Sequence, residues 1–479
     1  MDTGAPIYDA MLSYAAENNL RLHMPGHAGG RGLAEPFQTL ANLDLTEVPG
    51  LDDLHAPAEA IARARELLAW AYGADESYFL VNGASSGIHA LFMSLPEESV
   101  VVVPRNAHRS FFSGMVLSGA RPFYLPVQIH PELGTGMAVT RNDLADILAA
   151  QERVDAVFVT SPSYYGTTCS IAELAALAHV YGSVFYVDEA HGGHFSFHPG
   201  YPRSALQNGA DAAVNGLHKT LPVLNQGGAL HIKREKLLVE QLAAAYSLLT
   251  TTSPSYPILA SLDLARQLMM EQGYDLLEKS LQLAADYRKK INTIAGLHCY
   301  TEEEMKTIAG VDGLDPLKIL ISVRNLTISG YQTAALLRER YRIQVEAGDD
   351  NVILAMMSLF HHQHEWEEFY QAMGQIAALY RAGKQPDTTI KLPPVPRVHL
   401  SPRQAFYAGK RRMPLAQTVG LCAGEMVAAY PPGIPCLLPG EIITEEIYDY
   451  LCYLKSSPVR LQGPSQPGLE TLLVIEQTP

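Results

Sequence analysis

Two residues near the middle of the chain have types and positions that suit covalent chemistry. Asp188 ends the apolar run SVFYVDE, and Lys219 lies just past the apolar run DAAVN. A lysine amine can form a Schiff base with an aldehyde, and a nearby carboxylate can keep a pyridine nitrogen protonated. The pair therefore suits pyridoxal 5'-phosphate. The alternative is an aspartate that caps a helix and a lysine that lies on the surface.

A stretch of small residues, NGASSG over residues 82–87, follows the apolar run SYFLV and precedes a helical pattern. Small residues let the backbone approach an anion, and a helix start offers free N–H groups. Ala84, Ser85 and Ser86 thus form a candidate phosphate site. The same letters fit the G-x-S-x-G pattern of a serine hydrolase that would use Ser85 and Asp188. An ordinary strand-to-helix turn is the third interpretation.

The elements that must position these residues read as short apolar strands that alternate with helices. Helical spacing is found at residues 58–72 and 258–294, and helical patterns separate most of the strands. Strands are predicted at residues 77–81, 99–103, 121–127, 155–160, 183–189 and 211–215. Strands that are apolar throughout and alternate with helices indicate a parallel sheet covered on both faces. The predicted fold class is α/β with a mostly parallel sheet.

Composition argues against several classes of function. The chain has 50 acidic and 35 basic residues and a formal net charge of −15, which argues against a nucleic-acid partner. Five widely spaced cysteines form no C-x-x-C pair, so neither a metal site nor a disulfide scaffold is predicted. The start of the sequence lacks a signal-peptide pattern, and no apolar run is long enough to cross a membrane. We therefore expect a cytoplasmic protein without a membrane partner.

Changes of pattern divide the chain into four expected parts. These are an N-terminal segment (1–50), a large domain that binds the cofactor (51–295), a small α+β domain (296–384) and a C-terminal domain (385–479).

Three acidic residues have more than one interpretation. Asp52 and Asp53 either face a cationic substrate or cap the helix that begins near Ala58. Residues 415–430 have a helical pattern, and Glu425 within it either reaches a substrate amine or forms a salt bridge on that helix.

Several long blocks closely resemble the Orn/Lys/Arg decarboxylases, a family of fold-type I enzymes that use pyridoxal phosphate. The resemblance spans nearly the whole chain in the family's order and is to the short form of the family. The blocks are PGLDDLHAP (49–57), FLVNGASSGIHA (79–90), VPRNAHRS (103–110), VDEAHGGHFSFHP (187–199), HKTL (218–221), LTTTSPSYPILASLDLAR (249–266) and AAYPPGIPCLLPGE (428–441). It implies a transferase-like large domain with smaller α+β domains after it.

The resemblance gives roles to the residues that would touch the cofactor ring. Lys219 is the lysine that binds the cofactor aldehyde, and Asp188 is the partner of the pyridine nitrogen. His108 stacks on one face of the ring and Ala190 packs against the other. His191 faces the substrate, and either it or Lys219 protonates the substrate Cα.

The resemblance also implies phosphate ligands and a second subunit. Ala84, Ser85 and His218 would hold the phosphate. The family's site lies at a dimer interface, so Thr252 and Ser253 of a neighbouring chain would complete it. A homodimer or a larger homo-oligomer is expected.

The sequence departs from the family pattern in three places. Ala28 replaces a lysine, and Gly216 replaces a serine that is often a phosphate ligand. Gly227 and Gly228 stand where small hydroxyl residues are typical. Each lost hydroxyl removes a charge-assisted hydrogen bond worth about 1.5–3 kcal/mol, so weaker cofactor binding is expected.

The implied reaction is the decarboxylation of arginine, lysine or ornithine to an amine of the polyamine type, with release of carbon dioxide. Arginine is favoured by resemblance to short-form members. The alternatives are an aminotransferase or lyase with the same cofactor, a hydrolase that uses Ser85, and a regulatory protein that binds the cofactor without activity, which Ala28 and Gly216 would favour.

Overall fold

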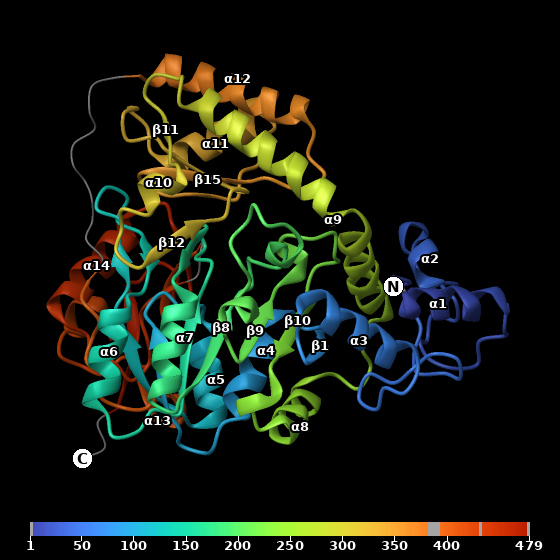
Figure 1. The fold of residues 1–479 in the computed structure, drawn as a ribbon. Helices are drawn as coiled ribbons and strands as arrows, with labels where there is room; N and C mark the ends of the chain where they lie inside the picture. Colours follow the sequence, from blue (N-terminus) through green and yellow to red (C-terminus); the bar gives the residue numbers. More distant parts are fainter. Residues whose placement is uncertain (1–2, 382–392, 431–433, 477–479) are drawn as a thin grey trace. The chain divides into compact units, whose positions relative to one another are not determined.

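The computed structural model describes residues 3–381, 393–430 and 434–476 (Figure 1). The chain divides into two compact units. Unit 1 comprises Met1–Ser94 and Val184–Glu278, and unit 2 comprises Leu95–Ser183 and Lys279–Pro479. The predicted boundary between residues 384 and 385 lies outside the described residues. Each unit is therefore built from two separate stretches of chain.

Unit 1 contains four strands in the order β1-β10-β9-β8. β8 and β9 are parallel, and β10 is antiparallel to both of its neighbours, β1 and β9. The elements are α1 (Pro6–Ala16), α2 (Glu35–Ala41), α3 (Ala60–Tyr72), β1 (Glu76–Leu80), α4 (Gly83–Met93), β8 (Val184–Asp188), β9 (Ala212–Asn215), the short 3-10 helix η3 (Leu217–Lys219), β10 (Gly228–Ile232), α8 (Val239–Leu249) and the first part of α9 (Tyr256–Ile291). The strands predicted for this unit are confirmed.

Helix α3 shows how the sequence sets both ends of an element. The carboxylate of Asp52 accepts hydrogen bonds from the backbone N–H groups of Ala58, Glu59, Ile61 and Ala62, at 2.8–3.1 Å. Asp52 therefore satisfies N–H groups that the first turn leaves without a helical partner, and its interpretation as a cap is confirmed. The helix ends at Gly73, whose φ of +64° is the left-handed conformation that glycine adopts at low cost.

The first stretch of unit 2 supplies three parallel strands in the order β6-β2-β3. Figure 1 shows α6 and α7 side by side in this unit. The elements are β2 (Val100–Pro104), α5 (Ser110–Ser118), β3 (Arg121–Leu125), β4 (Gln128–Ile129), β5 (Gly136–Ala138), α6 (Arg141–Ala150), β6 (Ala156–Thr160), β7 (Thr167–Cys169) and α7 (Ile171–Val180). The predicted α/β class with a mostly parallel sheet is confirmed.

Residues after α9 form an antiparallel sheet in the order β11-β13-β15-β14. Its elements and the helices that go with them are β11 (His298–Cys299), α10 (Glu302–Met305), β12 (Val311–Leu314), β13 (Lys318–Ser322), α11 (Gly330–Tyr341), β14 (Ala347–Gly348), β15 (Val352–Met356) and α12 (Gln363–Tyr380). α12 runs along the last part of α9, where the Glu367 carboxylate accepts a hydrogen bond from Tyr287 and pairs with Lys290 at 2.8 Å.

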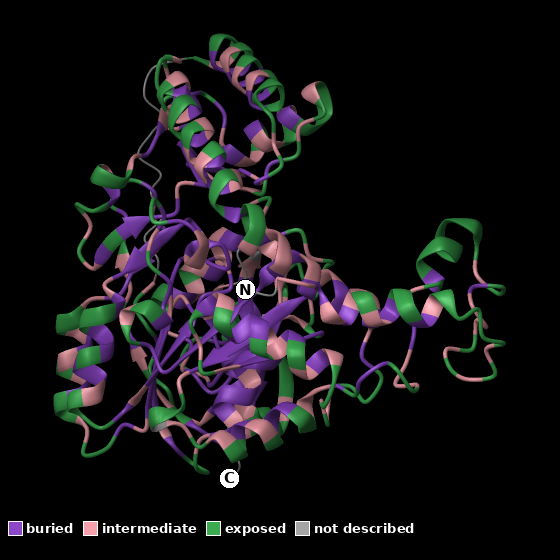
Figure 2. Ribbon diagram, turned by 45° about the vertical axis from the view of Figure 1, so that its right-hand side comes forward, coloured by how far each residue is buried: buried purple, intermediate pink, exposed green. Residues whose placement is uncertain are grey.

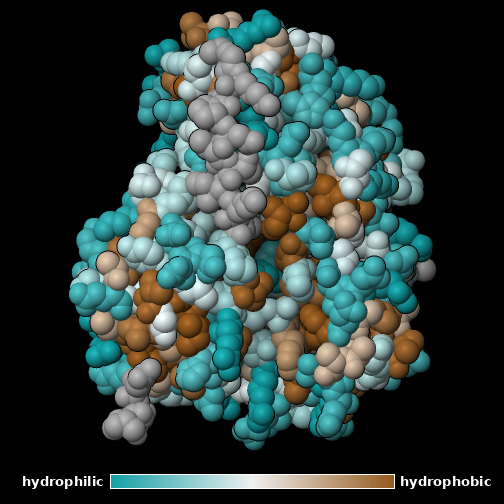
Figure 3. Space-filling model, turned by 90° about the vertical axis from the view of Figure 1, so that its left-hand side faces the viewer, coloured by the Kyte–Doolittle hydropathy of each residue, from teal (hydrophilic) through white to brown (hydrophobic). Residues whose placement is uncertain are grey.

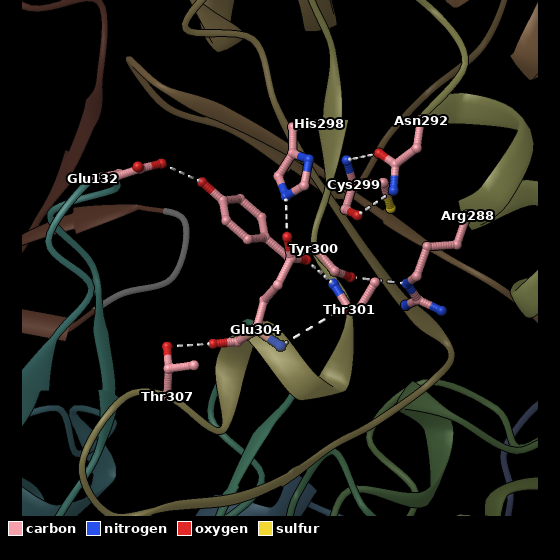
Figure 4. Close-up of polar contacts among 9 residues, drawn as sticks. All are labelled: Glu132, Arg288, Asn292, His298, Cys299, Tyr300, Thr301, Glu304 and Thr307. Atoms are coloured by element: carbon pink, nitrogen blue, oxygen red, sulfur yellow. Dashed lines mark hydrogen bonds and ion pairs between the residues drawn. The ribbon is translucent and has the colours of Figure 1, made fainter.

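Figure 4 shows the polar contacts that fix β11 and α10. Asn292 Oδ1 accepts from the backbone N–H of Cys299 at 2.6 Å, and its Nδ2 donates to the carbonyl of the same residue at 2.9 Å. Thr301 and Glu304 form a reciprocal capping box at the start of α10. The Glu304 carboxylate also lies 2.9 Å from His298 Nε2, so one side chain joins the helix to the strand.

The last part of unit 2 has its own apolar core, shared by a two-stranded and a three-stranded sheet. Its elements are α13 (Pro402–Tyr407), β16 (Lys410–Pro414), β17 (Val427–Tyr430), β18 (Ile434–Leu437), α14 (Glu445–Ser456), β19 (Arg460–Gln462) and β20 (Thr471–Ile475). The α-helix predicted at residues 415–430 is wrong, because this stretch forms a 3-10 turn, loops and β17. Gly424 lies so close to the backbone of β20 that an added Cβ would be 3.1 Å from the carbonyl oxygen of Leu473.

In both units, the strands contain mostly buried residues. Figure 2 shows strands that are buried and helices that carry an exposed face. On the face drawn in Figure 3, hydrophobic and hydrophilic residues are interspersed. Among the described residues, none of the helices combines the length and the apolar character that crossing a bilayer requires.

The cap of α3 gives a test of stability against pH. Burial alone would raise the pKa of Asp52, but the backbone N–H donors outweigh it and hold the pKa below its usual value. The carboxylate therefore stabilises the fold above the unfolded pKa of about 3.9, and this contribution is lost as the pH falls through the folded pKa. We expect Asp52→Ala to lower the free energy of unfolding by about 2 kcal/mol at pH 7, with a smaller difference from wild type below about pH 4.

Urea unfolding followed by circular dichroism would measure both values. Asp53→Ala is the matched control, because Asp53 is exposed and accepts one hydrogen bond, from the backbone of His55 at 2.8 Å. Equal losses for the two variants would contradict the capping role.

Candidate active site

The turn between β1 and α4 places the start of a helix next to the loop that follows η3. The backbone N–H of Gly83 donates to the carbonyl of Gln226 at 2.8 Å, and the hydroxyl of Ser86 donates to the carbonyl of Gly83 at 2.9 Å. A Cβ added at Gly87 would lie 2.8 Å from Leu80 Cδ1, so glycine lets α4 pack closely on β1. The helix start thus keeps the open N–H groups that suit an anion.

The start of β10 passes close to this helix start. A Cβ added at Gly228 would lie 2.7 Å from the carbonyl oxygen of Asn215 and 3.5 Å from the backbone nitrogen of Ala84. No side chain fits at residue 228 without a shift of the backbone. This is a physical reason for glycine at a place where the family resemblance leads one to expect a hydroxyl residue.

His218 is fixed by the same loop. Its Nδ1 lies 2.8 Å from the carbonyl oxygen of Gly227 and its backbone N–H donates to that oxygen at 3.1 Å. Because a carbonyl oxygen only accepts hydrogen bonds, the proton of the neutral ring lies on Nδ1, and Nε2 is the unprotonated nitrogen. Burial lowers the pKa of His218, and the nearby Lys219 charge lowers it further.

Asp188 is the last residue of β8 and is 5% exposed. Its Oδ1 accepts a hydrogen bond from the backbone N–H of Ala190 at 3.1 Å. Burial raises the pKa of Asp188, while the positive charge of Lys219 and the Ala190 N–H oppose that rise. The structure therefore places the predicted lysine close enough to act on the predicted aspartate, and both at the ends of strands in one sheet.

Lys219 ends the short helix η3, one turn after β9, and its Nζ lies 3.2 Å from Nε2 of His191. A Cβ added at Gly216 would lie 3.2 Å from Cδ and Cε of Lys219 and 3.0 Å from the carbonyl oxygen of Ala190. Gly216 therefore leaves room for the stem of the lysine. An amine, an imidazole and a buried carboxylate meet here, which is a combination that supports nucleophilic and proton-transfer chemistry.

Two residues that the sequence argument did not single out hold the loop after β8. The carboxylate of Glu189 accepts from the backbone N–H of Ala205 at 2.7 Å, and Asn215 Nδ2 donates to both the carbonyl and the carboxylate of Glu189, at 2.8 and 3.1 Å. Burial raises the pKa of Glu189 to about 8. A signal existed in the sequence, because a second acid directly follows Asp188 at the end of an apolar strand.

Thr252, Ser253 and His108 are the remaining predicted residues. Thr252 and Ser253 are in an exposed loop between α8 and α9. His108 belongs to unit 2, where its Nδ1 lies 3.0 Å from Ser110 Oγ. Of the block AAYPPGIPCLLPGE, residues 431–433 lie outside the described residues. The roles of Thr252, Ser253 and His108, like those of the other predicted site residues, stay predictions.

The arrangement in unit 1 fits pyridoxal phosphate. The helix start beside Ala84 has room for an anion such as the phosphate. The amine of Lys219 can react with the aldehyde. A protonated ring nitrogen would stabilise the charged form of the buried Asp188.

Two family models match the chain in succession. Residues 5–365 match the model of the Orn/Lys/Arg decarboxylase major domain, and residues 388–471 match the model of the C-terminal domain of the same family.

Curated relatives match over the full length. An arginine decarboxylase of Halalkalibacterium halodurans is 37% identical, and one of Bacillus subtilis is 34% identical, each over 98% of both chains. A lysine decarboxylase of Pseudomonas aeruginosa is 24% identical over 94% of this chain and 75% of its own length.

Solved structures share the fold. The lysine decarboxylase of Francisella novicida superposes with a TM-score of 0.85 at 22% identity, covering 99% of this chain and 82% of that one. A NifS-like protein superposes with a TM-score of 0.55 at 14% identity, over 78% of this chain and 95% of its own.

The close approach of β10 to α4 gives a direct test of the phosphate site. Gly228→Ala should weaken the binding of pyridoxal phosphate about tenfold or more, because the added methyl group forces the start of β10 away from Asn215 and the Ala84 N–H. Fluorescence titration of the cofactor-free protein would measure the affinity.

Gly32→Ala is the control, since an added Cβ there meets nothing within 4 Å. Unchanged cofactor affinity in a folded Gly228→Ala protein would show that this approach does not shape the site.

Proposed function

This chain belongs to the Orn/Lys/Arg decarboxylase family and is a decarboxylase of basic amino acids, and from that premise we propose that its substrate is arginine and its cofactor pyridoxal 5'-phosphate. The cofactor proposal is supported by one observation above all. Lys219 Nζ lies 3.2 Å from His191 Nε2 while its charge acts on the buried Asp188. The substrate proposal is supported by full-length similarity to arginine decarboxylases.

Each part of the cofactor would have a partner in this chain. Lys219 would bind the aldehyde, and Asp188 would hold the proton on the pyridine nitrogen. Ala84, Ser85 and His218 would hold the phosphate. Bound pyridoxal phosphate supplies an aromatic ring that accepts the electron pair left on Cα when carbon dioxide leaves.

The burial of Asp188 decides how well that proton is held. A carboxylate in a site of low polarity interacts strongly with a positive ring nitrogen, because little water screens the pair. Asp188 itself is 5% exposed, so little water reaches its carboxylate. A neutral ring would accept electrons poorly, so the carboxylate acts on the rate although it transfers no group itself.

The proton that replaces the carboxyl group must come from a side chain beside Cα. Lys219 and His191 lie within hydrogen-bond distance of each other, so a proton on one can pass to the other. Either residue can therefore deliver it.

We also propose the wider setting of the enzyme. The product would be agmatine, an amine that feeds polyamine biosynthesis, and the enzyme would act in the cytoplasm, where the five free cysteines stay reduced. The working form would be a homodimer in which His108 stacks on the cofactor and the loop with Thr252 and Ser253 enters the neighbouring site. Its support is the exposure of that loop and of Leu20, Leu22 and Met24.

The four-part division of the chain at residues 50, 295 and 384 remains a proposal. Transamination by the same cofactor is the second candidate reaction and differs in that it releases no carbon dioxide. The hydrolase that would use Ser85 has no support from the family assignment.

Carbon dioxide release from arginine, lysine and ornithine tests the proposal. Wild type should turn over arginine fastest, and Lys219→Ala should lose about 10³-fold or more in rate together with the visible absorbance of the bound cofactor.

Lys233→Ala is the matched control, because Lys233 is a partly exposed lysine paired with Asp75 at 3.3 Å, at the opposite end of β10 from Gly228. A wild type that releases carbon dioxide fastest from lysine would contradict the choice of arginine. Full activity in Lys219→Ala would contradict the mechanism.

A further inference from the structure

Unit 2 contains a cavity of about 580 Å³, a size that suits a small organic ligand. Its walls come from several parts of the unit. These are the end of β2 and the loops near β4 and β5, Tyr165 after β6, Tyr331 of α11 with the segment 349–351, residues 393–395, and β17, β18 and α14. The residues proposed above to bind the cofactor aldehyde and ring nitrogen belong to unit 1. The cavity belongs to the same unit as His108, and none of the residues that line it has been given a role so far.

The walls carry uncompensated negative charge. Asp349 and Asp350 both line the cavity and, within residues 3–381, 393–430 and 434–476, neither forms an ion pair. The cavity also contacts Arg105, but the guanidinium is bound by both oxygens of Glu441, at 2.6 and 2.9 Å. The arginine is thus neutralised by a partner of its own, and the two aspartates are left to face a ligand.

Aromatic rings and free hydroxyls surround these carboxylates. Tyr165, Tyr331, Tyr450 and Tyr453 line the cavity, and the hydroxyl of Tyr453 donates to Asp350. Tyr165 is 8% exposed, yet its hydroxyl makes no hydrogen bond to any described residue. Aromatic faces attract cations, and a hydroxyl on the cavity wall that bonds to no described residue favours a polar ligand that can bond to it.

The charge is held at an energetic cost. Burial raises the pKa of Asp349 to about 6, with a further rise from Asp350, while two backbone N–H groups oppose it. Burial also raises the pKa of Tyr331, and the two aspartates add to that rise. A cation in the cavity would relieve this repulsion.

We propose that this cavity binds a small organic cation with an ammonium or guanidinium group. Aromatic walls suit such a cation better than a bare metal ion, and no group of three or more metal-ligating side chains occurs in the described part of the chain. The cation would be the basic substrate or the amine product, and this identification, unlike the class of ligand, rests on the proposed function.

Calorimetric titration of the cofactor-loaded protein with agmatine tests the proposal, with cofactor absorbance recorded in parallel. Wild type should show a binding event that leaves the absorbance unchanged, besides any event at the cofactor. We call binding that leaves the cofactor absorbance unchanged the silent event. Asp350→Asn keeps an oxygen that can accept a hydrogen bond from Tyr453 but removes the negative charge, so the affinity of the silent event should fall about tenfold or more. Tyr331→Leu should weaken it as well through loss of an aromatic face.

Asp146→Asn is the matched control, because Asp146 is an exposed acid on α6 of the same unit. Its silent event should equal that of wild type, and uncharged 1,5-pentanediol should produce none. Titration of arginine into Lys219→Ala protein, which cannot turn it over, shows whether the cavity prefers the substrate or the product. If arginine binds the cavity more tightly than agmatine, the ligand is the substrate. If agmatine binds more tightly, the ligand is the product.

Failure of this proposal and failure of the proposed function give different results. A silent event without carbon dioxide release from arginine would keep the cavity as a cation site and reject the proposed reaction. Absence of a silent event in wild type, or an event of equal affinity in a folded Asp350→Asn protein, would overturn the cavity proposal even in an active enzyme.

Discussion

A carboxylate buried at the end of a strand is the constraint on which the site depends. Asp188 is almost completely shielded from water, so its charge is stable only if positive charge or hydrogen-bond donors lie beside it. The chain supplies one backbone N–H and the charge of Lys219, and burial still raises the pKa. The carboxylate of Asp188 is therefore only partly stabilised by these two groups, and a protonated pyridine nitrogen would stabilise it further. In the proposed function, Asp188 would therefore both bind the ring nitrogen and keep it protonated.

The scaffold keeps a second acid from competing with that charge. Glu189 follows Asp188 directly, and with a pKa of about 8 it is mainly neutral at pH 7. It bonds to Ala205 and Asn215 and so holds the loop that carries His191, without placing a second negative charge next to the first. Two glycines allow close approaches in the same site. Gly216 leaves room for the side chain of Lys219, and Gly228 lets the start of β10 lie close to Asn215 and to the start of α4.

Much of this could be predicted from the sequence, and the exceptions have physical causes. The apolar strands and α3 with its Gly73 end were predictable since their signals are local, and so were the strand-end positions of Asp188 and Lys219. The prediction of an α-helix at residues 415–430 was wrong, because the same spacing of apolar residues also allows them to pack in the core between small sheets. There Glu425 accepts backbone N–H groups of Ser465 and Leu473 at 2.7 Å, contacts that no local pattern encodes. The acidic, tyrosine-lined cavity of unit 2 was not predictable either, since its walls come from distant parts of the chain.

In the proposed function, Asp188 would hold a proton on the ring nitrogen of the bound cofactor. Nuclear magnetic resonance of the enzyme loaded with cofactor labelled with ¹⁵N at that nitrogen measures this directly. The account predicts the chemical shift of a protonated nitrogen in wild type from neutral to mildly alkaline pH, and that of an unprotonated nitrogen in Asp188→Asn. An unprotonated nitrogen in the active wild type would contradict it.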